Sequence, residues 1–491
     1  MQSNPLPSPT IGATGEPETQ DSDVLVVGLP LDGSLTPTLA KINEATEGWF
    51  LALVEAGQIR GKKGELSLIA SPLGSGSGPT MILVVGLGDK EVTRCQAFDS
   101  AATAIRTLSD RNRESIVVAL AESFPESMHD VIVGGAIVAC ECQAIYQSEP
   151  ALEIPKSISF SGMSDETVER GNILGHSINH TRRLVNEPPA SLYPESFAEM
   201  AKEIVSGSGV SVEIWDEEKL SDEGCRALLA VGAGSSKPSR LVIMRYDGGG
   251  KEAPLAIVGK GVTFDSGGLS LKPSEGMNDM KCDMAGAATV VGVMHAIANL
   301  GVKQNVIGFC GLAENMVSGD SYKLGDVIET RSGKTIEILN TDAEGRVVLA
   351  DTLDVAIQHQ PRAMVDLATL TGACMVALCT EVAGLMTNDQ AVCDQIEAAA
   401  TEEGELVWQL PMFKLYDEKV KSKVADIRNI GEGRWGGAIT AAKFLENFVG
   451  DVPWVHIDIA GPAFADSPKP HRDAGATGAM VRSLVRWVES Q

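Results

Sequence analysis

The sequence predicts an α/β protein with a smaller N-terminal α/β domain and a larger C-terminal α/β domain whose mixed sheet is flanked by helices. Strand-like apolar runs alternate with helix-like segments along most of the chain, which is the βαβ pattern. At 491 residues the chain is too long for one typical core and suggests two or three domains. Pro188 and Pro189 interrupt a helical pattern, so a second domain is expected to begin there.

The N-terminal part divides into three segments. Residues 1–22 are rich in Ser, Pro, Thr and Glu and lack the basic start and apolar region of a secretion signal, which predicts a disordered tail. Residues 23–163 are predicted to form the N-terminal α/β domain, and residues 164–190 a linking helix. Strands are expected at 24–27, 81–86 and 115–120, and helices at 39–56 and 130–146.

The second domain is predicted over residues 191–491. Its apolar strands alternate with helical patterns, for example at 285–300 and 347–359, which implies a large mixed or parallel sheet covered on both faces. The expected strands are 211–214, 240–246, 255–258, 305–310, 335–339, 363–367 and 454–459.

Composition and charge exclude several classes of protein. A content of 44% hydrophobic and 22% charged residues excludes a chain that is disordered throughout. The net charge of −26 argues against nucleic acid and anionic membranes as partners. The longest apolar segment, 284–298, is too short to span a bilayer. The nine cysteines are odd in number and mostly lie in apolar runs, which favours buried free thiols and a cytoplasmic location.

Two weaker motifs are read as structural. Gly74 to Gly78 and Val85 to Gly88 do not complete a nucleotide-binding motif, so turns are favoured over phosphate loops. His176 and His180 lie four residues apart on one face of the linking helix, as two zinc ligands would. Ser177 stands where a zinc protease would have glutamate, so a solvated or interdomain pair is favoured.

Charged residues cluster in two glycine-containing segments, 259–283 and 340–346. The first follows the apolar run 255–258, and its glycines are expected to mark where the backbone leaves the sheet for a loop. The second lies between the β-branched run 335–339 and a helical pattern. Open α/β sheets place ligands at such strand-to-helix turns. The candidate site residues among these charged residues are Lys260, Asp265, Lys272, Asp283, Asp342, Glu344 and Arg346.

This charge pattern predicts a metal site. Bare carboxylates that lie close together repel one another, so four of them suggest bound divalent cations, and two divalent ions would balance their charge. A dinuclear centre activates water and stabilises a tetrahedral oxyanion, which is hydrolase chemistry. One lysine would then be a neutral amine ligand and the other a charged electrophile. The alternative is a metal-free cluster in which the basic residues form salt bridges.

Several segments resemble the leucyl aminopeptidases, a family of cytosolic two-metal exopeptidases. They are Gly259-Lys260-Gly261 through Lys272-Pro273, Met280-Lys281-Cys282-Asp283-Met284 and Asn340-Thr341-Asp342-Ala343-Glu344-Gly345-Arg346. The last of them is similar to the family signature N-T-D-A-E-G-R-L, with Val347 in place of leucine. Segments 366–373 and 456–461 also resemble family segments, so that the resemblance runs from Thr181 to the C-terminus.

The resemblance implies roles for the charged residues. Asp265 and Glu344 would contact both metals, Asp342 would complete one metal site, and Lys260 and Asp283 would complete the other. Lys272 would polarise the scissile carbonyl, and Arg346 would hold a bicarbonate that acts as general base. The pocket for the first side chain of the substrate would be lined by Met280, Asn340, Thr369 and Gly372.

The expected function is that of a cytoplasmic dinuclear-metal aminopeptidase, a protease that hydrolyses unblocked N-terminal residues from peptides in intracellular turnover. Leucine and other apolar residues would be preferred. The resemblance implies a homohexamer, and the ligands suit Mn²⁺ or Zn²⁺, with Mg²⁺ as an alternative. One rival is a non-catalytic chaperone or binding protein on the same fold. Another is a phosphoesterase, which is disfavoured because the motifs contain no histidine.

Overall fold

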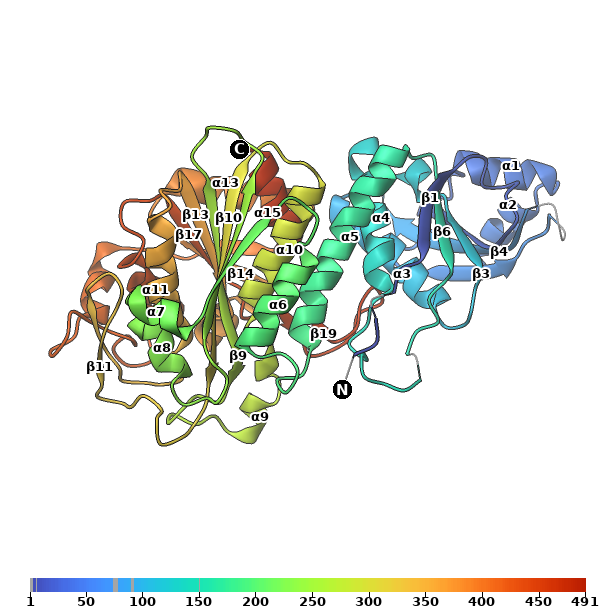
Figure 1. The fold of residues 1–491 in the computed structure, drawn as a ribbon. Helices are drawn as coiled ribbons and strands as arrows, with labels where there is room; N and C mark the ends of the chain where they lie inside the picture. Colours follow the sequence, from blue (N-terminus) through green and yellow to red (C-terminus); the bar gives the residue numbers. More distant parts are fainter. Residues whose placement is uncertain (1–2, 6, 74–77, 90–91, 150) are drawn as a thin grey trace. The chain divides into compact units, whose positions relative to one another are not determined.

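The structure is a computed structural model that describes residues 3–5, 7–73, 78–89, 92–149 and 151–491. The chain divides into an N-terminal unit, which runs to Asn179 and includes Ser467–Ala474, and a C-terminal unit, His180–Asp466 with Gly475–Gln491 (Figure 1). The division falls inside α5 (Asp165–Asn186), the helix that occupies the predicted linking segment. The glycine-rich stretch at 74–77, read as a turn, lies outside the described residues.

The N-terminal unit contains a six-stranded sheet in the order β1-β6-β5-β2-β4-β3. All neighbours are parallel except β3 and β4. Its strands are β1 (Thr10–Thr14), β2 (Ser22–Pro30), β3 (Leu66–Ala70), β4 (Pro79–Gly88), β5 (Ser115–Val118) and β6 (Ser157–Ser161).

Two parts of this sheet differ from the sequence prediction. Residues 10–14, within the predicted disordered tail, form an edge strand that pairs in parallel with β6 from Thr10↔Ser157 to Thr14↔Ser161. A polar edge strand pairs with one neighbour and leaves its outer backbone groups to solvent, so it needs no apolar run and composition does not reveal it. Val85 to Gly88, read as a turn, is the end of β4.

The helices of the N-terminal unit pack closely through glycines. α3 (Arg94–Leu108) packs on α4 (His129–Ala139), and a Cβ added to Gly135 of α4 would lie 2.3 Å from the carbonyl oxygen of Phe98. The helix predicted at 39–56 is two helices, α1 (Pro37–Ala45) and α2 (Trp49–Glu55). They are separated because Gly48 takes the left-handed conformation, with φ of 86°.

The C-terminal unit contains an eight-stranded sheet in the order β15-β14-β17-β13-β9-β10-β8-β7. The four central strands β17, β13, β9 and β10 are mutually parallel, whereas β14 and β8 run antiparallel to their central neighbours, so the predicted mixed sheet is confirmed. The strands are β7 (Ser211–Trp215), β8 (Arg240–Asp247), β9 (Leu255–Asp265), β10 (Asn305–Asn315), β13 (Ala363–Ala368), β14 (Ala383–Thr387), β15 (Val407–Gln409) and β17 (Trp454–Asp458).

Helices cover both faces of this sheet (Figure 1). One face carries α6 (Pro194–Ile204), α10 (Ala285–Asn299), α13 (Gln390–Glu403) and α15 (Val481–Glu489), and the other carries α8 (Arg226–Gly232), α11 (Gly345–Ile357) and α14 (Gly437–Glu446). Every residue of β13 and β17 is buried, as expected of central parallel strands. The shorter elements are α7 (Glu217–Asp222), α9 (Ser274–Met277), α12 (Gly372–Leu378), β18 (Phe464–Ala465), β19 (Gly475–Ala476), η1 (Leu120–Ser123), η2 (Glu126–Met128), η3 (Met280–Cys282) and η4 (Lys414–Val420).

The glycines after Val258 do not end the strand, which corrects the prediction of a loop from Gly259 onward. β9 continues to Asp265, and Lys260 therefore lies within the sheet. The glycines are needed for close packing rather than for a turn. A Cβ on Gly259 would lie 2.5 Å from the Cα of Ala287 in α10, and one on Gly261 would lie 2.4 Å from Cδ2 of Leu312.

The sequence pattern also predicts the run 335–339 as a strand of the main sheet, and this prediction is wrong. Thr335–Glu337 forms β12 of a separate three-stranded sheet in the order β11-β12-β16. Its neighbours are β11 (Val327–Glu329) and β16 (Ile427–Arg428). Hydrophobic periodicity indicates a strand but not the sheet to which it belongs.

Within the described ranges, every helix is too short or too polar to cross a lipid bilayer. The nine cysteines are all free, and six of them are buried.

Candidate metal centre and active site

The site lies where the four central parallel strands of the C-terminal unit end. β9 ends at Asp265, β10 at Asn315 and β17 at Asp458, and Thr369 directly follows β13. Because these strands are adjacent and parallel, their carboxyl ends meet at one edge of the sheet, the usual place for a ligand in an open α/β fold.

An irregularity in β9 turns Asp265 toward this site. Along β10, Ala313 pairs with Val262 but Glu314 pairs with Phe264, so Thr263 is an extra residue on β9. In a regular strand, Lys260 and Asp265 would point to opposite faces because side chains alternate. The extra residue reverses the alternation, and both side chains therefore reach the same cluster of charges.

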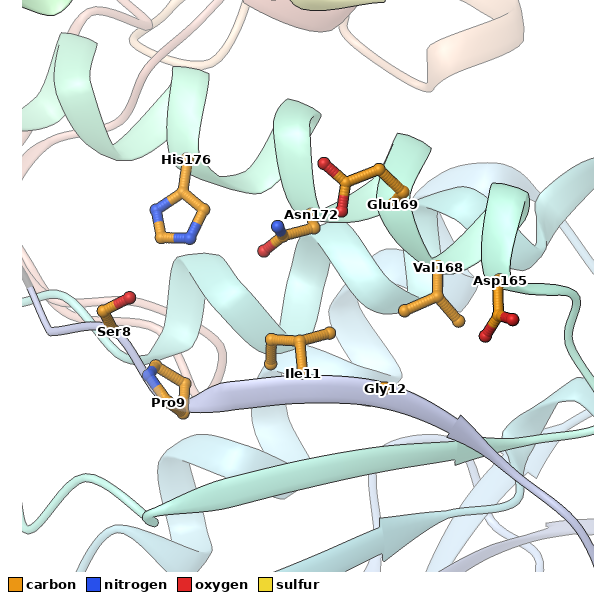
Figure 2. Close-up of a pocket in the computed structure, with 9 residues that line it drawn as sticks. All are labelled: Ser8, Pro9, Ile11, Gly12, Asp165, Val168, Glu169, Asn172 and His176. Carbon is orange, nitrogen blue, oxygen red and sulfur yellow. The ribbon is translucent and has the colours of Figure 1, made fainter.

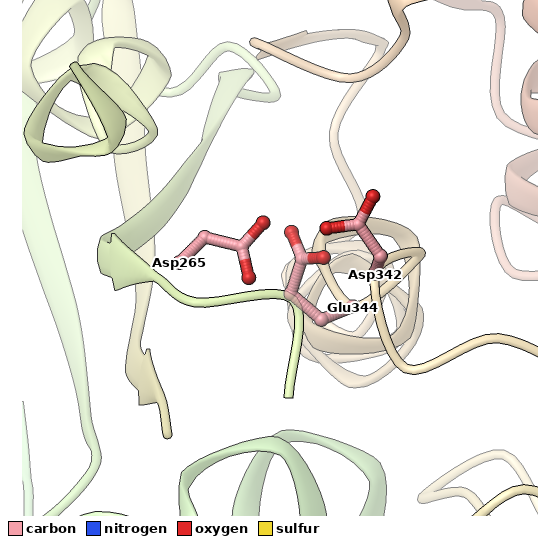
Figure 3. Close-up of side chains that lie close together, drawn as sticks. All are labelled: Asp265, Asp342 and Glu344. Atoms are coloured by element: carbon pink, nitrogen blue, oxygen red, sulfur yellow. The ribbon is translucent and has the colours of Figure 1, made fainter. Parts of the chain in front are cut away.

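Three carboxylates form the centre of the cluster. Asp265, Asp342 and Glu344 each offer an oxygen atom, and these atoms lie within 4.8 Å of one another. Figure 3 shows the three side chains directed toward one another, Asp265 from the end of β9 and the others from the segment that leads into α11. Glu344 occupies the N-cap position of α11, where the positive end of the helix dipole favours a carboxylate.

Each of the two predicted lysines bridges two carboxylates. The Nζ atom of Lys260 lies 2.7 Å from Oδ1 of Asp283 and 2.9 Å from Oε1 of Glu344. The Nζ atom of Lys272 lies 2.8 Å from Oδ2 of Asp265 and also contacts Oδ1 of Asp342. These ion pairs bring all four predicted acidic residues and both lysines into one site. With four carboxylates and two ammonium groups, the site has a formal excess of two negative charges.

This excess of negative charge perturbs the carboxylates. The pKa of Asp265 is raised to about 6, because burial and the charge of Glu344 outweigh the opposing effect of Lys272 and Lys260. Burial also raises the pKa of Asp283. The pKa of Lys260 is raised because the carboxylates of Asp283, Glu344 and Asp265 outweigh the effect of its burial. The cluster therefore favours binding of additional positive charge.

The residues fit a divalent metal ion. Among the described residues, no hydrogen-bond donor reaches the buried oxygens Oδ2 of Asp283 and Oε2 of Glu344. Buried acceptors of this kind are normally satisfied, and an ion is one way to satisfy them. Carboxylate oxygens are typical ligands of Mg²⁺ and Mn²⁺, and a lysine amine in the same site would suit Zn²⁺.

Arg346 lies beside the cluster, two residues after Glu344 and in the first turn of α11. Its Nη1 donates a hydrogen bond to the carbonyl oxygen of Asn429 at 2.9 Å, and its Nε is buried without a hydrogen-bond partner in the described part of the chain. Burial lowers the pKa of Arg346 to about 10, so the side chain remains a cation at neutral pH. A buried cation with an unused donor suits an anionic ligand.

Two of the four predicted pocket residues contact the cluster or its loops. Thr369 accepts a hydrogen bond from Lys260 on its carbonyl oxygen at 2.9 Å and donates one from Oγ1 to Asp283 at 2.8 Å. Oδ1 of Asn340 accepts from the backbone N–H of Asp342 at 2.9 Å.

The other two pocket residues border connecting segments. Met280 begins the short helix η3, which leads to Asp283, and it is half-buried. Gly372 begins α12 and is exposed, with nothing within 4 Å of where its Cβ would be.

The two histidines of the linking helix have separate surroundings. His176 lines a pocket of about 340 Å³ in the N-terminal unit, together with residues of β1 and the same face of α5. Figure 2 shows His176, Asn172 and Glu169 along this face. The His180 ring packs edge-on against His295, with ring centroids 4.9 Å apart. These contacts place the two rings in different environments.

Several polar residues around the cluster were not predicted from the sequence. Asn315, Thr341 and Asn429 are almost fully buried and form hydrogen bonds with the segments that carry the charged residues. Asn315 could have been found, because it is a polar residue at the carboxyl end of an apolar strand that neighbours β9. Asn429 follows the small sheet strand β16, and no local pattern indicates its position.

Comparisons with known proteins point to one family. The profile of the cytosol aminopeptidase family, catalytic domain, matches residues 179–485, and that of the family's N-terminal domain matches residues 26–142. A probable cytosol aminopeptidase of Rhodopirellula baltica is 61% identical, over 100% of this chain and 99% of the relative. One from Syntrophotalea carbinolica is 39% identical, over 96% of this chain and 98% of the relative.

Solved structures show the same fold. A tomato leucine aminopeptidase variant has a TM-score of 0.88 at 31% identity and covers 100% of this chain and 99% of its own. The bottromycin maturation enzyme BotP in complex with Mn has a TM-score of 0.86 at 33% identity, over 96% of this chain and 99% of its own. These findings confirm the resemblance noted in the sequence and support an aminopeptidase, a metal-dependent hydrolase of peptide bonds. The chain therefore belongs to the cytosol aminopeptidase family.

Proposed function

We propose that this protein is a dinuclear-metal aminopeptidase that removes unblocked N-terminal residues from peptides, with leucine and other apolar residues preferred. The observation that carries the proposal is the group of three carboxylates, whose oxygen atoms lie within 4.8 Å of one another. Lys260 connects a fourth carboxylate, that of Asp283, to this group. A cluster of this charge and burial suits two divalent cations better than one. Membership of an aminopeptidase family supports the reaction.

Five side chains hold the metal ions in this proposal. Asp265 and Glu344 would contact both ions, Asp342 would complete one site, and Asp283 would complete the other together with Lys260, which would coordinate as a neutral amine after the bound cations displace its proton. Mn²⁺ or Zn²⁺ is favoured, with Mg²⁺ as an alternative, because the ligands are mainly carboxylates with one amine. When bound, the ions supply Lewis acidity and lower the pKa of a water molecule.

Two cationic side chains act on the substrate and the attacking water. Lys272 is the cluster lysine that solvent reaches, with 17% of its side chain exposed against 3% for Lys260. Its ammonium group polarises the scissile carbonyl and stabilises the negative charge that develops on the carbonyl oxygen. Arg346 would hold a bicarbonate ion, which when bound would supply a general base for the attacking water and return the proton to the leaving amine.

Substrate selection is assigned to Met280, Asn340, Thr369 and Gly372. Thr369 contacts both Lys260 and Asp283, so a side chain that it borders lies beside the reacting groups. Gly372 leaves open space at its Cβ position, which would admit a branched apolar side chain such as that of leucine.

We also infer that the chain forms a homohexamer in the cytoplasm and acts on peptides during intracellular protein turnover. Both inferences rest on the resemblance to the leucyl aminopeptidases. Sedimentation of the purified protein would measure the number of chains in the assembly. A monomer at micromolar concentration would contradict the hexamer.

The reaction is tested by offering three substrates side by side. Leucine p-nitroanilide should be cleaved after addition of Mn²⁺ or Zn²⁺, and treatment with a chelator should abolish the cleavage. N-acetyl-leucine p-nitroanilide should resist, because its amine is blocked, and p-nitrophenyl phosphate should also resist. Cleavage of the phosphate alone would support a phosphoesterase. Cleavage of none would favour a non-catalytic protein, and full activity in a preparation shown to be metal-free would contradict the metal mechanism.

A further inference from the structure

We propose that Asn315 is a positioning residue for the metal centre. Its side-chain amide orients Asp265 and ties this ligand to the separate segment that carries Asp342 and Glu344. The inference rests on the proposed metal-dependent function and adds a residue that lies outside the charged set.

One nitrogen atom makes both connections. Nδ2 of Asn315 donates to Oδ1 of Asp265 at 2.8 Å and to the carbonyl oxygen of Thr341 at 3.0 Å. An amide nitrogen has two hydrogens, so both bonds can form at once. Thr341 immediately precedes Asp342, and the amide therefore links the end of β9 to the loop before α11.

The contacts of Asp265 show what the amide achieves. Its Oδ1 accepts from Asn315 and from the backbone N–H of Gly267, the latter at 2.8 Å. Its Oδ2 faces the cluster and contacts Lys272. The two neutral donors thus hold Oδ1 of Asp265 and leave Oδ2 to face Lys272 and the cluster. They add no charge to a site that already holds more carboxylates than lysines.

The backbone is arranged so that this contact can form. The extra residue Thr263 on β9 brings Asp265 directly opposite Asn315 in the strand register. A regular pairing continued from Ala313↔Val262 would place Asn315 opposite Phe264 instead. The bulge therefore creates the pair, and bulges near functional sites commonly redirect one side chain in this way.

The second connection has further support. The hydroxyl of Tyr322 also donates to the carbonyl oxygen of Thr341, at 2.9 Å, and the Thr341 hydroxyl donates to the carbonyl oxygen of Gly267 at 2.7 Å. The two ligand-bearing segments are thereby held together by neutral hydrogen bonds. Asn315 provides the side chain of this network that directly contacts a proposed ligand, and only 1% of it is exposed.

Loss of a partner that orients a metal ligand typically weakens metal affinity by about 10–100-fold. Asn315→Leu keeps the branched shape and the number of side-chain heavy atoms and removes both hydrogen bonds. We expect it to weaken Mn²⁺ binding by about this factor, and to lower kcat at subsaturating Mn²⁺ with partial recovery at high Mn²⁺. Asn315→Ser is smaller and cannot reach both acceptors at once, so it should also weaken Mn²⁺ binding.

The same strand provides a matched control. Asn305 begins β10, as Asn315 ends it, and is also buried, with 7% exposed. Its Nδ2 donates to two carbonyl oxygens, those of Gly250 at 3.1 Å and Glu252 at 2.7 Å. Asn305→Leu should lower the melting temperature to a comparable extent but change the Mn²⁺ dissociation constant by less than about twofold, since no proposed ligand is involved.

The experiment is titration of the chelator-treated full chain with Mn²⁺ by calorimetry, together with thermal unfolding of each variant. Weaker binding by both Asn315 variants, with Asn305→Leu unchanged, supports the inference. Folded Asn315 variants that bind Mn²⁺ as the wild type does would overturn it, as would equal weakening by Asn305→Leu. A wild-type chain that binds no divalent metal would instead refute the proposed function, so that the two failures are distinguishable.

Discussion

The Nζ of Lys272 lies 2.8 Å from Oδ2 of Asp265, although the two residues are seven positions apart in the chain. The intervening loop folds back on itself, because the backbone N–H of Lys272 donates to the carbonyl oxygen of Ser266 at 2.9 Å. Gly267 permits this reversal with φ of 84°, a conformation that other residues rarely adopt. The loop thus places a partly exposed cation beside the proposed metal ligands.

We expect Lys272→Ala to lower kcat far more than it raises KM. If the ammonium group stabilises the oxyanion, its contribution grows as charge develops, and such contacts are typically worth about 10²–10³ in kcat. Steady-state kinetics on leucine p-nitroanilide would measure the change. Lys443→Ala is the control, because Lys443 is buried and also pairs with two carboxylates, those of Asp417 and Glu446. An equal loss of kcat in both variants would contradict the assigned role.

Glu344→Ala should nearly abolish activity and reduce the bound metal to fewer than two ions per chain. Its carboxylate is proposed to contact both ions, whereas the apolar strands and helices around it remain intact. Asp342→Ala should give a similar but smaller loss of metal, since Asp342 serves one ion. Elemental analysis of the folded variants checks both expectations. Two tightly bound ions in Glu344→Ala would exclude a bridging role.

Arg346→Ala should lower kcat by roughly 10²–10⁴, the usual range for loss of general-base catalysis. Any increase of the wild-type rate with added bicarbonate should disappear in this variant, while its metal content stays the same. Kinetics across a bicarbonate series provide the measurement. Arg331→Ala is a suitable control, because Arg331 pairs with Asp354 and Glu223. A variant that still responds to bicarbonate would show that another residue binds the anion.

Gly372→Val should lower kcat/KM for leucine p-nitroanilide more than for alanine p-nitroanilide. The added side chain has open space in the structure, so the fold should tolerate it while the pocket becomes smaller. Gly319→Val is the control, since a Cβ there also meets nothing within 4 Å. If the ratio of kcat/KM for the two substrates did not change, Gly372 would not line the pocket.

Asp351 should make stability depend on pH. Burial raises the pKa of Asp351 to about 6, so the folded chain binds this proton more tightly than the unfolded chain does. Its contribution to the free energy of unfolding is therefore complete below about pH 4 and is lost as the pH rises to about 6. A shift of this size corresponds to at most about 3 kcal/mol.

Urea unfolding of the wild type and Asp351→Asn at several pH values would test this. Relative to the wild type, the variant should become more stable as the pH rises from about 4 to about 7. Asp426→Asn should show a change of opposite sign at lower pH: hydrogen bonds from Thr335 lower the pKa of the exposed Asp426, so relative to the wild type this variant should become less stable as the pH rises to about 4 and then stay constant. A difference that stays constant with pH would show that Asp351 does not titrate as described.

The sequence by itself determined which charged residues form the cluster. Lys260, Asp265, Asp283, Asp342 and Glu344 lie in short segments rich in glycine and charge next to apolar runs, and such local patterns survive in a single sequence. The alternation of strands and helices likewise indicated the mixed sheet. Both predictions depend on residues that are close together in the chain, because side-chain chemistry and periodicity over short segments can be recognised from the sequence itself.

Only the tertiary structure decided how these residues face one another. The bulge at Thr263 directs Asp265 toward Lys260, the separate sheet of β12 sets the approach of the Asn340–Glu344 segment, and Asn315 reaches across to both. Each of these features depends on pairing between strands far apart in the sequence. Periodicity reports the face on which a residue lies but not its neighbouring strand or its register, because both are set by packing of the whole sheet.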